Sequence, residues 1–198
     1  MTPRFLSLVA AAFTVLSAAS ACARPEQVLA SDLYPDSHQS KTTVVMNKVL
    51  ERYHYRKMTL DDKFAAEILK NYLTALDPNR SFFLQRDVTR FEGNARRLDD
   101  NLKEGKLDIA FDIFRIYRKQ VDERVSYALA LLDKGFDFSE KETYQFDRSK
   151  APWPKNETEL NDIWRKRVKN DFLSLRLADK DGAKIREQLR KRYEGLAL

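Results

Sequence analysis

Apolar residues in the middle of the chain recur at steps of three and four positions. The run comprises Ala110, Phe114, Tyr117, Val121, Val125, Ala128 and Leu132. Because an α-helix has 3.6 residues per turn, this spacing places all of them on one face and predicts an amphipathic helix of about seven turns. Gly135 follows and is expected to end it. A helix of this length has to cover its apolar face, and that need constrains the rest of the fold.

Two ways of covering that face are open, a coiled-coil dimer and a bundle within the chain. We favour the bundle, because the flanking segments carry matching apolar faces and the run is short for an independent coiled coil. Only 5 glycines and 6 prolines occur in 198 residues, which leaves little material for a turn-rich β-sandwich. The prediction is an all-α fold, an irregular multi-helix bundle with one long central helix.

Helical spacing continues upstream of the long helix. A helix is predicted from about Lys41, with Val45, Val49, Arg52 and Tyr53 on one face. The next helix is expected to begin at an N-cap residue, Thr59, and to end at the turn before Pro78. Residues 85–103 then show helical spacing, which predicts a third helix.

Downstream, Ser139 and Glu142 have the spacing of a capping box, which predicts a short helix. Asn156 with Glu159 is a weaker version of the same pattern and predicts a longer helix that buries Leu160 and Trp164, among others. A last helix is expected over residues 183–196.

The N-terminus has the layout of a secretory signal peptide. Arg4 precedes an uncharged, apolar stretch over residues 5–19, and small residues follow at the predicted cleavage region. We therefore predict a signal peptide over residues 1–23, a flexible arm over 24–40 and a helical domain over 41–198. Cys22, the only cysteine, has two interpretations: a lipidated thiol that would anchor the chain to a membrane, or a bystander beside an ordinary cleavage site.

Residue patterns for catalysis, cofactor binding and metal binding were not found. Ser149 and Lys150 are adjacent, but neighbours in an extended chain point apart, so they are not expected to form a catalytic dyad. The net charge of +6 comes from 36 basic and 30 acidic residues that are interleaved along the chain. We therefore expect solvated helix faces and no binding of nucleic acid.

The stretch "DRSKAPWPKN", residues 147–156, interrupts the helical pattern with Trp153 between Pro152 and Pro154. Prolines fix φ and stop helix from spreading, which suits a rigid corner between helices. A tryptophan held between prolines also suits a docking motif, because it is a preorganised anchor. We favour the structural corner, in which Trp153 seals the bundle beside Trp164.

This stretch, with the residues around it, resembles the N-terminal domain of bacterial tail-specific proteases, the C-terminal-processing serine peptidases of the periplasm. The blocks "FDFSEKETYQFDRSKAPWPKNETELNDIWRKRVKND", "LDIAFDIFRIYRKQVDERVSYALALL" and "LRLADKDGAKIREQLRKRYE" carry the resemblance, which runs from about Thr42 to Tyr193. It identifies residues 41–198 as a helical N-terminal domain of this type.

The resemblance implies a protease that trims or degrades periplasmic proteins from their C-termini, in some members with a lipoprotein adaptor. The PDZ domain and the Ser/Lys peptidase core of the family have no counterpart in these residues. The chain is therefore expected to be inactive alone, to act as a scaffold or partner-binding domain, and to be a fragment truncated at its C-terminus. The alternative is a standalone exported helical adaptor derived from such a protease.

Overall fold

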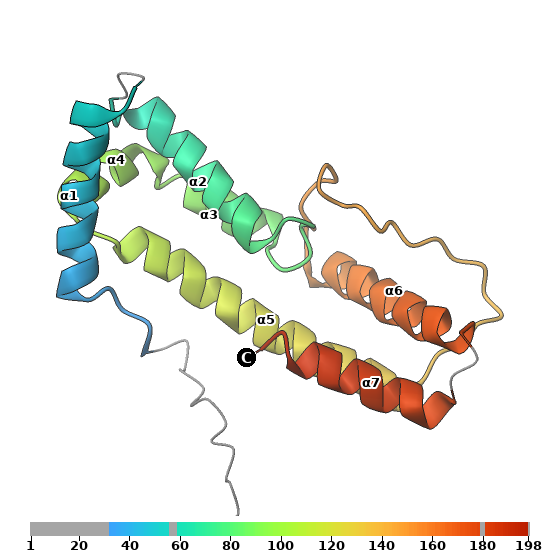
Figure 1. Ribbon diagram of the computed structural model, residues 1–198. Coiled ribbons are helices and arrows are strands. Elements are labelled where there is room, and N and C mark those ends of the chain that lie inside the picture. The colour runs from blue at the N-terminus through green and yellow to red at the C-terminus, as the bar shows by residue number, and fades with distance from the viewer. Residues whose placement is uncertain (1–31, 56–58, 179–180, 198) are drawn as a thin grey trace, which may run out of the picture.

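The computed structural model describes residues 32–55, 59–178 and 181–197, and these residues are helical with no strand among them (Figure 1). The predicted all-α fold is confirmed. In chain order the elements are α1 (Ser37–Tyr53), α2 (Asp62–Leu76), α3 (Gln85–Glu92), the 3-10 turn η2 (Ala95–Arg97), α4 (Leu98–Lys103), α5 (Asp108–Lys134), α6 (Glu157–Arg176) and α7 (Gly182–Glu194). The predicted signal peptide, Cys22 and residues 24–31 of the predicted arm lie outside the described residues.

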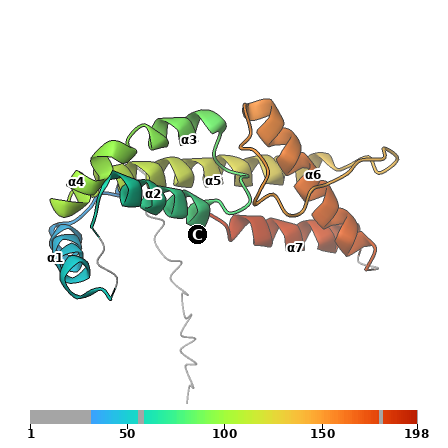
Figure 2. The ribbon, with the colours of Figure 1, turned by 90° about the horizontal axis from the view of Figure 1, so that it is seen from above.

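The long central helix is α5. It runs from the end of the molecule that holds α1 and α4 to the end that holds α6 and α7 (Figures 1 and 2). Its C-terminal half packs against α6 and α7, and its buried residues there include the predicted Val121, Val125, Ala128 and Leu132. The apolar face is thus covered by helices of the same chain, as the bundle interpretation required.

Two hydrophobic clusters lie along α5. We call the first the C-terminal core; its buried members are Phe82, Leu84, Val121, Val125, Ala128, Leu132, Leu160, Trp164, Val168, Phe172, Ile185, Leu189 and Tyr193. We call the second the N-terminal core; its buried members are Ala65, Leu69, Leu73, Phe83, Val88, Phe91, Leu98 and Ile113. Burial of each large side chain favours folding by about 1.5–3 kcal/mol.

A short segment outside the helices, residues 82–84, joins the two cores. Phe82 and Leu84 enter the C-terminal core, whereas Phe83 between them enters the N-terminal core. The indole Nε1 of the buried Trp164 donates a hydrogen bond of 2.6 Å to the carbonyl of Ser81, so α6 is tied to the start of the same segment.

Two predicted boundaries upstream of α5 were wrong. The N-cap of α2 is Asp61, whose carboxylate accepts a hydrogen bond of 2.8 Å from the N–H of Phe64, and not Thr59. The helix predicted over residues 85–103 is interrupted: α3 ends before Gly93, and η2 and α4 follow. This change of direction lets Val88, Phe91 and Leu98 all reach the N-terminal core.

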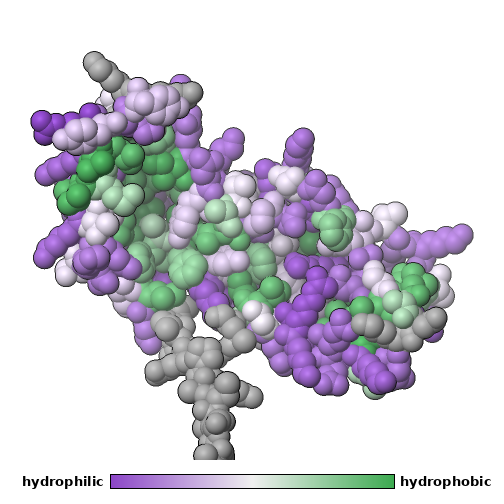
Figure 3. Space-filling model, in the orientation of Figure 1, coloured by the Kyte–Doolittle hydropathy of each residue, from purple (hydrophilic) through white to green (hydrophobic). Residues whose placement is uncertain are grey.

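Helix α1 begins at Ser37, earlier than predicted, because Asp36 and Gln39 form a capping box there. The face with Val45 and Val49, which would be expected to turn inward, is exposed together with Met46 and Leu50. It forms an apolar surface over α1 in Figure 3. The inward contact comes instead from Asn47, whose side-chain amide donates a hydrogen bond of 2.6 Å to the carbonyl of Leu102. No helix of the described residues is long and apolar enough to cross a membrane.

Candidate partner-binding surface

The proline-bracketed tryptophan packs against the segment that joins the two cores. The Trp153 ring meets Phe83 edge-on, with ring centroids 6.2 Å apart, and the Arg80 guanidinium lies 5.2 Å from its centroid. The N–H of Gln85 donates a hydrogen bond of 2.8 Å to the carbonyl of Pro154, which is itself buried. Arg80 also donates to the carbonyl of Ala151. These contacts hold the chain against the bundle just before α6 begins.

Trp153 packs against Phe83 and not, as expected, against Trp164. Trp153 is half-buried beside the N-terminal core, whereas Trp164 is fully buried in the C-terminal core and pairs with Phe82 and Tyr193. The expectation that Trp153 packs beside Trp164 was therefore wrong. Its contacts suit a structural corner; a docking role for Pro152, Trp153 and Pro154 remains a prediction.

The turn that presents Arg80 is built around a buried carboxylate. Asp77 is 1% exposed and accepts hydrogen bonds from the backbone N–H groups of Ser81, Phe82 and Phe83 at 2.8, 2.8 and 3.1 Å. Burial raises the pKa of the Asp77 carboxyl above its ordinary value, while these three donors act in the opposite direction. The turn is thereby ordered, and Arg80 takes a positive φ of 50° at its tip.

Residues 135–156 follow α5 and lie along α6 without forming a helix (Figure 1). The short helix predicted from Ser139 and Glu142 was wrong, because Glu142 does not cap a helix. Its carboxylate accepts hydrogen bonds from Arg165 and Lys169 of α6, including one of 3.1 Å from Nη1 of Arg165. These two cations lower the pKa of Glu142 to about 2. The segment is thus fastened to α6 by an ion-pair cluster.

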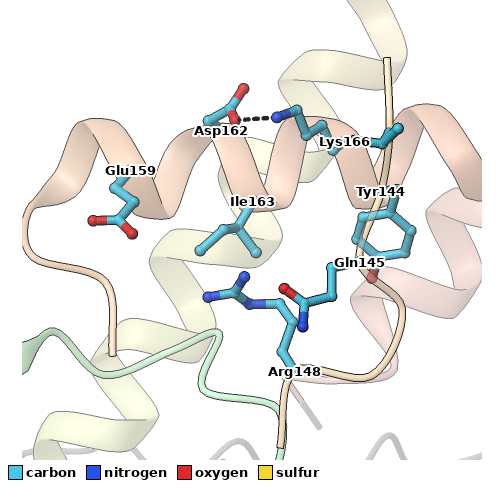
Figure 4. Close-up of a pocket in the computed structure, with 8 residues that line it drawn as sticks. Tyr144, Gln145, Arg148, Glu159, Asp162, Ile163 and Lys166 are labelled. Carbon is cyan, nitrogen blue, oxygen red and sulfur yellow. Dashed lines mark ion pairs between the residues drawn. The ribbon is translucent and has the colours of Figure 1, made fainter. Parts of the chain in front are cut away.

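A cavity of about 290 Å³ opens between α6 and the segment next to this cluster (Figure 4). Glu159, Asp162, Ile163 and Lys166 line it from α6, and Thr143, Tyr144, Gln145 and Arg148 line it from the segment. Within it, Lys166 forms an ion pair of 2.8 Å with Asp162. The Glu159 carboxylate accepts a hydrogen bond of 2.9 Å from the N–H of Lys155, next to the N-cap Asn156 that was predicted for α6.

Ser149 and Lys150 lie exposed in the turn that follows this cavity. The N–H of Ser149 donates a hydrogen bond of 2.9 Å to the carboxylate of Asp147, which forms a local turn. In helices α5 and α6, the hydroxyls of Ser126 and Ser174 donate to carbonyls four residues back, at 2.9 Å each. Among the described residues no group of histidine, cysteine and acidic side chains has the arrangement of a metal site.

Several polar residues with defined partners were missed by sequence reasoning. Arg124 of α5 is only 6% exposed and donates to the side chain of Asn161 on α6. Glu142 was predicted to cap a short helix and not to bind cations of α6, and Arg148 was given no role of its own. The one that a local signal could have revealed is Asp77, since an aspartate at the start of a proline turn commonly accepts hydrogen bonds from the following N–H groups.

The sequence of this helical bundle is similar to those of known proteins. Residues 46–197 match the family model described as the tail specific protease N-terminal domain. The chain is also 41% identical, over 145 residues, to the tail-specific protease of Haemophilus influenzae. That alignment covers 73% of this chain and 21% of the relative, so the chain spans about a fifth of the length of that protein.

Proposed function

We propose that this chain, which belongs to the tail-specific protease family, acts as the non-catalytic helical scaffold and partner-binding domain of an exported C-terminal-processing protease. The observation that carries this proposal is the family match, which extends over residues 46–197 and so includes nearly all of the helical bundle. We assign the cleavage chemistry to the rest of such a protease. That part corresponds to the roughly four fifths of the Haemophilus influenzae relative that the alignment with this chain does not cover.

The side chains of the bundle support a structural role. The buried residues form two apolar cores, and the buried polar groups Asp77 and Arg124 hold the chain and the helices together. The helical serines Ser126 and Ser174 use their hydroxyls to bond backbone carbonyls of their own helices. A nucleophilic serine would instead need a base within hydrogen-bond reach.

Location and partners are part of the same proposal. The N-terminal pattern favours export to the bacterial periplasm, and membrane association would follow only if Cys22 were lipidated. The partners are then protein substrates and a lipoprotein adaptor, bound through the full-length protease. Nucleic acid is not proposed as a partner, because basic side chains such as Lys119, Lys191 and Arg190 lie in ion pairs with acidic ones.

A domain exchange tests the proposal. Residues 46–197 of this chain would replace the matching region of the Haemophilus influenzae protease, and cleavage of a substrate with a C-terminal tag would be measured beside the unaltered protease and the isolated chain. We expect the chimera to cleave and the isolated chain to be inactive. Cleavage by the isolated chain that persists after removal of contaminating proteases, or a folded chimera without activity, would contradict the scaffold role.

A further inference from the structure

Helix α1 contributes no buried residue to the bundle, although its sequence is amphipathic. It contacts α4 and the loop that follows α4 through the side that holds Ser40, Val44 and Asn47. The opposite side carries five large apolar side chains, each between 43% and 71% exposed: Val45, Met46, Val49, Leu50 and Tyr53. We call these five residues the α1 face, and Figure 3 shows apolar residues gathered over this helix. An exposed apolar surface of this kind marks a site of interaction.

Three cations line one edge of the α1 face. Lys41, Lys48 and Arg52 are spaced seven and four residues apart, so they lie on the same side of the helix, next to Val45. All three are exposed, and none forms an ion pair within the part of the chain that the structure describes. The Arg52 guanidinium lies 5.8 Å from the ring centroid of Tyr53, which joins this edge to the apolar face. The edge therefore offers positive charge that no acid of the bundle neutralises.

The acidic residues around α1 are directed elsewhere. Glu51, the only acid within α1, follows Ser40, Val44 and Asn47 at helical spacing and so lies on the side of α4. There the pKa of Lys103 is raised by its hydrogen bond with Asp99 and also by the charge of Glu51. The remaining acids of these segments have roles of their own.

Two kinds of role occupy those remaining acids. In α4 and its loop, Asp100 pairs with Lys103 and Glu104 pairs with Lys106. Asp36 and Asp61 are N-caps that accept hydrogen bonds from backbone N–H groups, and Asp62 lies in the first turn of α2, where negative charge is favourable. The positive edge of the α1 face is thus left for an acidic partner.

An apolar face with one cationic edge matches an amphipathic helix that has one acidic edge. The apolar stripe of such a helix packs along the α1 face, and its acids meet the cations as charges beside a coiled-coil seam do. Helix α1 stands at one end of the bundle, where a helix can lie along it (Figure 1).

Two other occupants fit these features less well. A second copy of the chain brings the same three cations and no acidic edge, because Glu51 lies on the side of α4. An anionic membrane favours cations on both edges of a helix that lies in its surface, but the other edge of the α1 face carries Gln39 and Leu50 and no cation. The charge distribution therefore favours a protein helix.

We propose that the α1 face binds an amphipathic helix of a protein partner whose acidic side chains lie along Lys41, Lys48 and Arg52. The inference rests on the proposed role as a partner-binding domain and specifies the surface and the chemistry of the partner.

Two designed helical peptides test the charge complementarity. Both are N-acetylated and C-amidated and repeat one heptad three times, Leu-Glu-Ala-Leu-Glu-Ala-Gln in the acidic peptide and Leu-Lys-Ala-Leu-Lys-Ala-Gln in the basic one. The leucines form the apolar stripe, and the charges lie along one edge of it. Each is titrated into the 15N-labelled chain, below the concentration at which it self-associates, while backbone amides are observed by NMR. We expect the acidic peptide to shift amides 41–53 and to bind at least about tenfold more tightly than the basic one, with a preference that falls as salt is raised.

Charge reversal in the chain sharpens this test. Lys41→Glu, Lys48→Glu and Arg52→Glu together should reverse the preference, so that the basic peptide binds more tightly. The matched control reverses three exposed lysines outside α1, namely Lys150, Lys155 and Lys184. It changes the net charge by the same amount and should keep the preference for the acidic peptide.

Removal of apolar side chains tests the face itself. Met46→Gln combined with Val49→Gln should weaken binding of the acidic peptide by about tenfold or more, because apolar contact is lost. Glutamine is a good helix former and both positions are exposed, so the melting temperature should stay as in the wild type.

The proposal is overturned if the wild-type chain binds the acidic peptide no more tightly than the basic one, or if either set of α1 variants binds as the wild type does. Flotation with phosphatidylglycerol vesicles and sedimentation equilibrium of the chain alone examine the other occupants. Vesicle binding or dimerisation that is lost in the double glutamine variant would also overturn it, by assigning the face to a membrane or to a second copy. None of these measurements includes a peptidase, so this proposal and the scaffold role tested by domain exchange can fail separately.

Discussion

At the scale of single residues, Trp153 is held in place by the prolines beside it and by two contacts with a distant part of the chain. The two neighbouring prolines restrict the backbone conformation around Trp153. Its ring contacts the Phe83 ring and the guanidinium of Arg80. Both contacts come from the turn after α2, about seventy residues earlier in the chain. The corner therefore joins the entry of α6 to the segment that connects the two cores.

Replacement of Trp153 by alanine should lower the free energy of unfolding by about 2 kcal/mol, below the usual cost for a fully buried tryptophan because the ring is only half-buried. Urea denaturation measures the change. Phe146→Ala is the control: this ring is 79% exposed, so its loss should change stability by less than about 0.5 kcal/mol. Unchanged stability in Trp153→Ala would favour a docking role for the residue instead.

The ion pairs of Glu142 should make the free energy of unfolding depend on pH in the acid range. The folded-state pKa of its carboxyl is lowered from 4.5 to about 2, so its contribution is present above pH 4.5 and is lost as the pH falls towards 2. Glu142→Gln should therefore be less stable than the wild type at neutral pH, and the difference should vanish as the pH falls through this window. Urea midpoints across the range measure it.

Glu140→Gln provides the comparison for this experiment, since Glu140 is exposed on the same segment and no ion pair is formed by it among the described residues. Its removal should leave the pH dependence as in the wild type. A stability difference for Glu142→Gln that stays constant between neutral pH and pH 2 would contradict the ion-pair explanation.

At the scale of elements, α1 is attached to the bundle through a close approach at Gly105. This glycine has a φ of +75°, and a Cβ there would lie 2.5 Å from the carbonyl oxygen of Ser40 and 2.9 Å from Cγ2 of Val44. Both neighbours belong to α1. Only glycine permits this distance between α1 and the loop after α4, because any other residue would meet backbone atoms that cannot move independently.

Gly105→Ala should consequently release α1. We expect faster hydrogen exchange of the α1 amides, together with a loss of about 1–3 kcal/mol of overall stability from the strained φ. Gly135→Ala separates the two effects, because Gly135 also has a positive φ, of +80°, but a Cβ there would have open space. It should lower overall stability without selective exchange of α1, and a similar exchange pattern in both variants would refute the contact at Gly105.

At the scale of the whole molecule, α5 and residues 82–84 belong to both cores. The two cores are therefore expected to unfold together, as small single domains usually do. The two tryptophans of the chain report on different cores, since Trp164 is buried in the C-terminal core and Trp153 packs against the N-terminal core.

Single-tryptophan variants test this coupling by fluorescence. Trp153→Phe leaves Trp164 as the reporter, and Trp164→Phe leaves Trp153. Adding Leu69→Ala, which removes a side chain from the N-terminal core, should destabilise by about 2–4 kcal/mol and shift the urea midpoint of both reporters equally. A shift seen by Trp153 but not by Trp164 would show that the cores unfold independently.

Much of the helical architecture could be predicted from the sequence, because the signals are local. The spacing of Val121, Val125, Ala128 and Leu132 predicted the buried face of α5, and Ile185, Leu189 and Tyr193 are buried at a regular helical spacing in α7. Asn156 caps α6 as expected, since a cap requires only groups within three residues. Spacing and caps act over one or two turns and need no knowledge of distant residues.

The candidate surface could not be predicted in this way, because its residues are defined by partners far along the chain. Ser139 and Glu142 satisfy a local capping pattern, yet two cations 23 and 27 residues away hold Glu142 and keep the segment extended. Similarly, Val45 and Val49 form an apolar helical face, but the close fit of Ser40 and Val44 against Gly105 turns the opposite side of α1 inward.

By itself, then, the sequence determined the class of fold, the long central helix and the family, because all three depend on the order and spacing of nearby side chains. The tertiary structure alone decided which aromatic ring meets Trp153, which groups bind Glu142, and that Arg148 lines a cavity without an acidic partner among the described residues. These features depend on distances between segments, and such distances are set only when the helices pack.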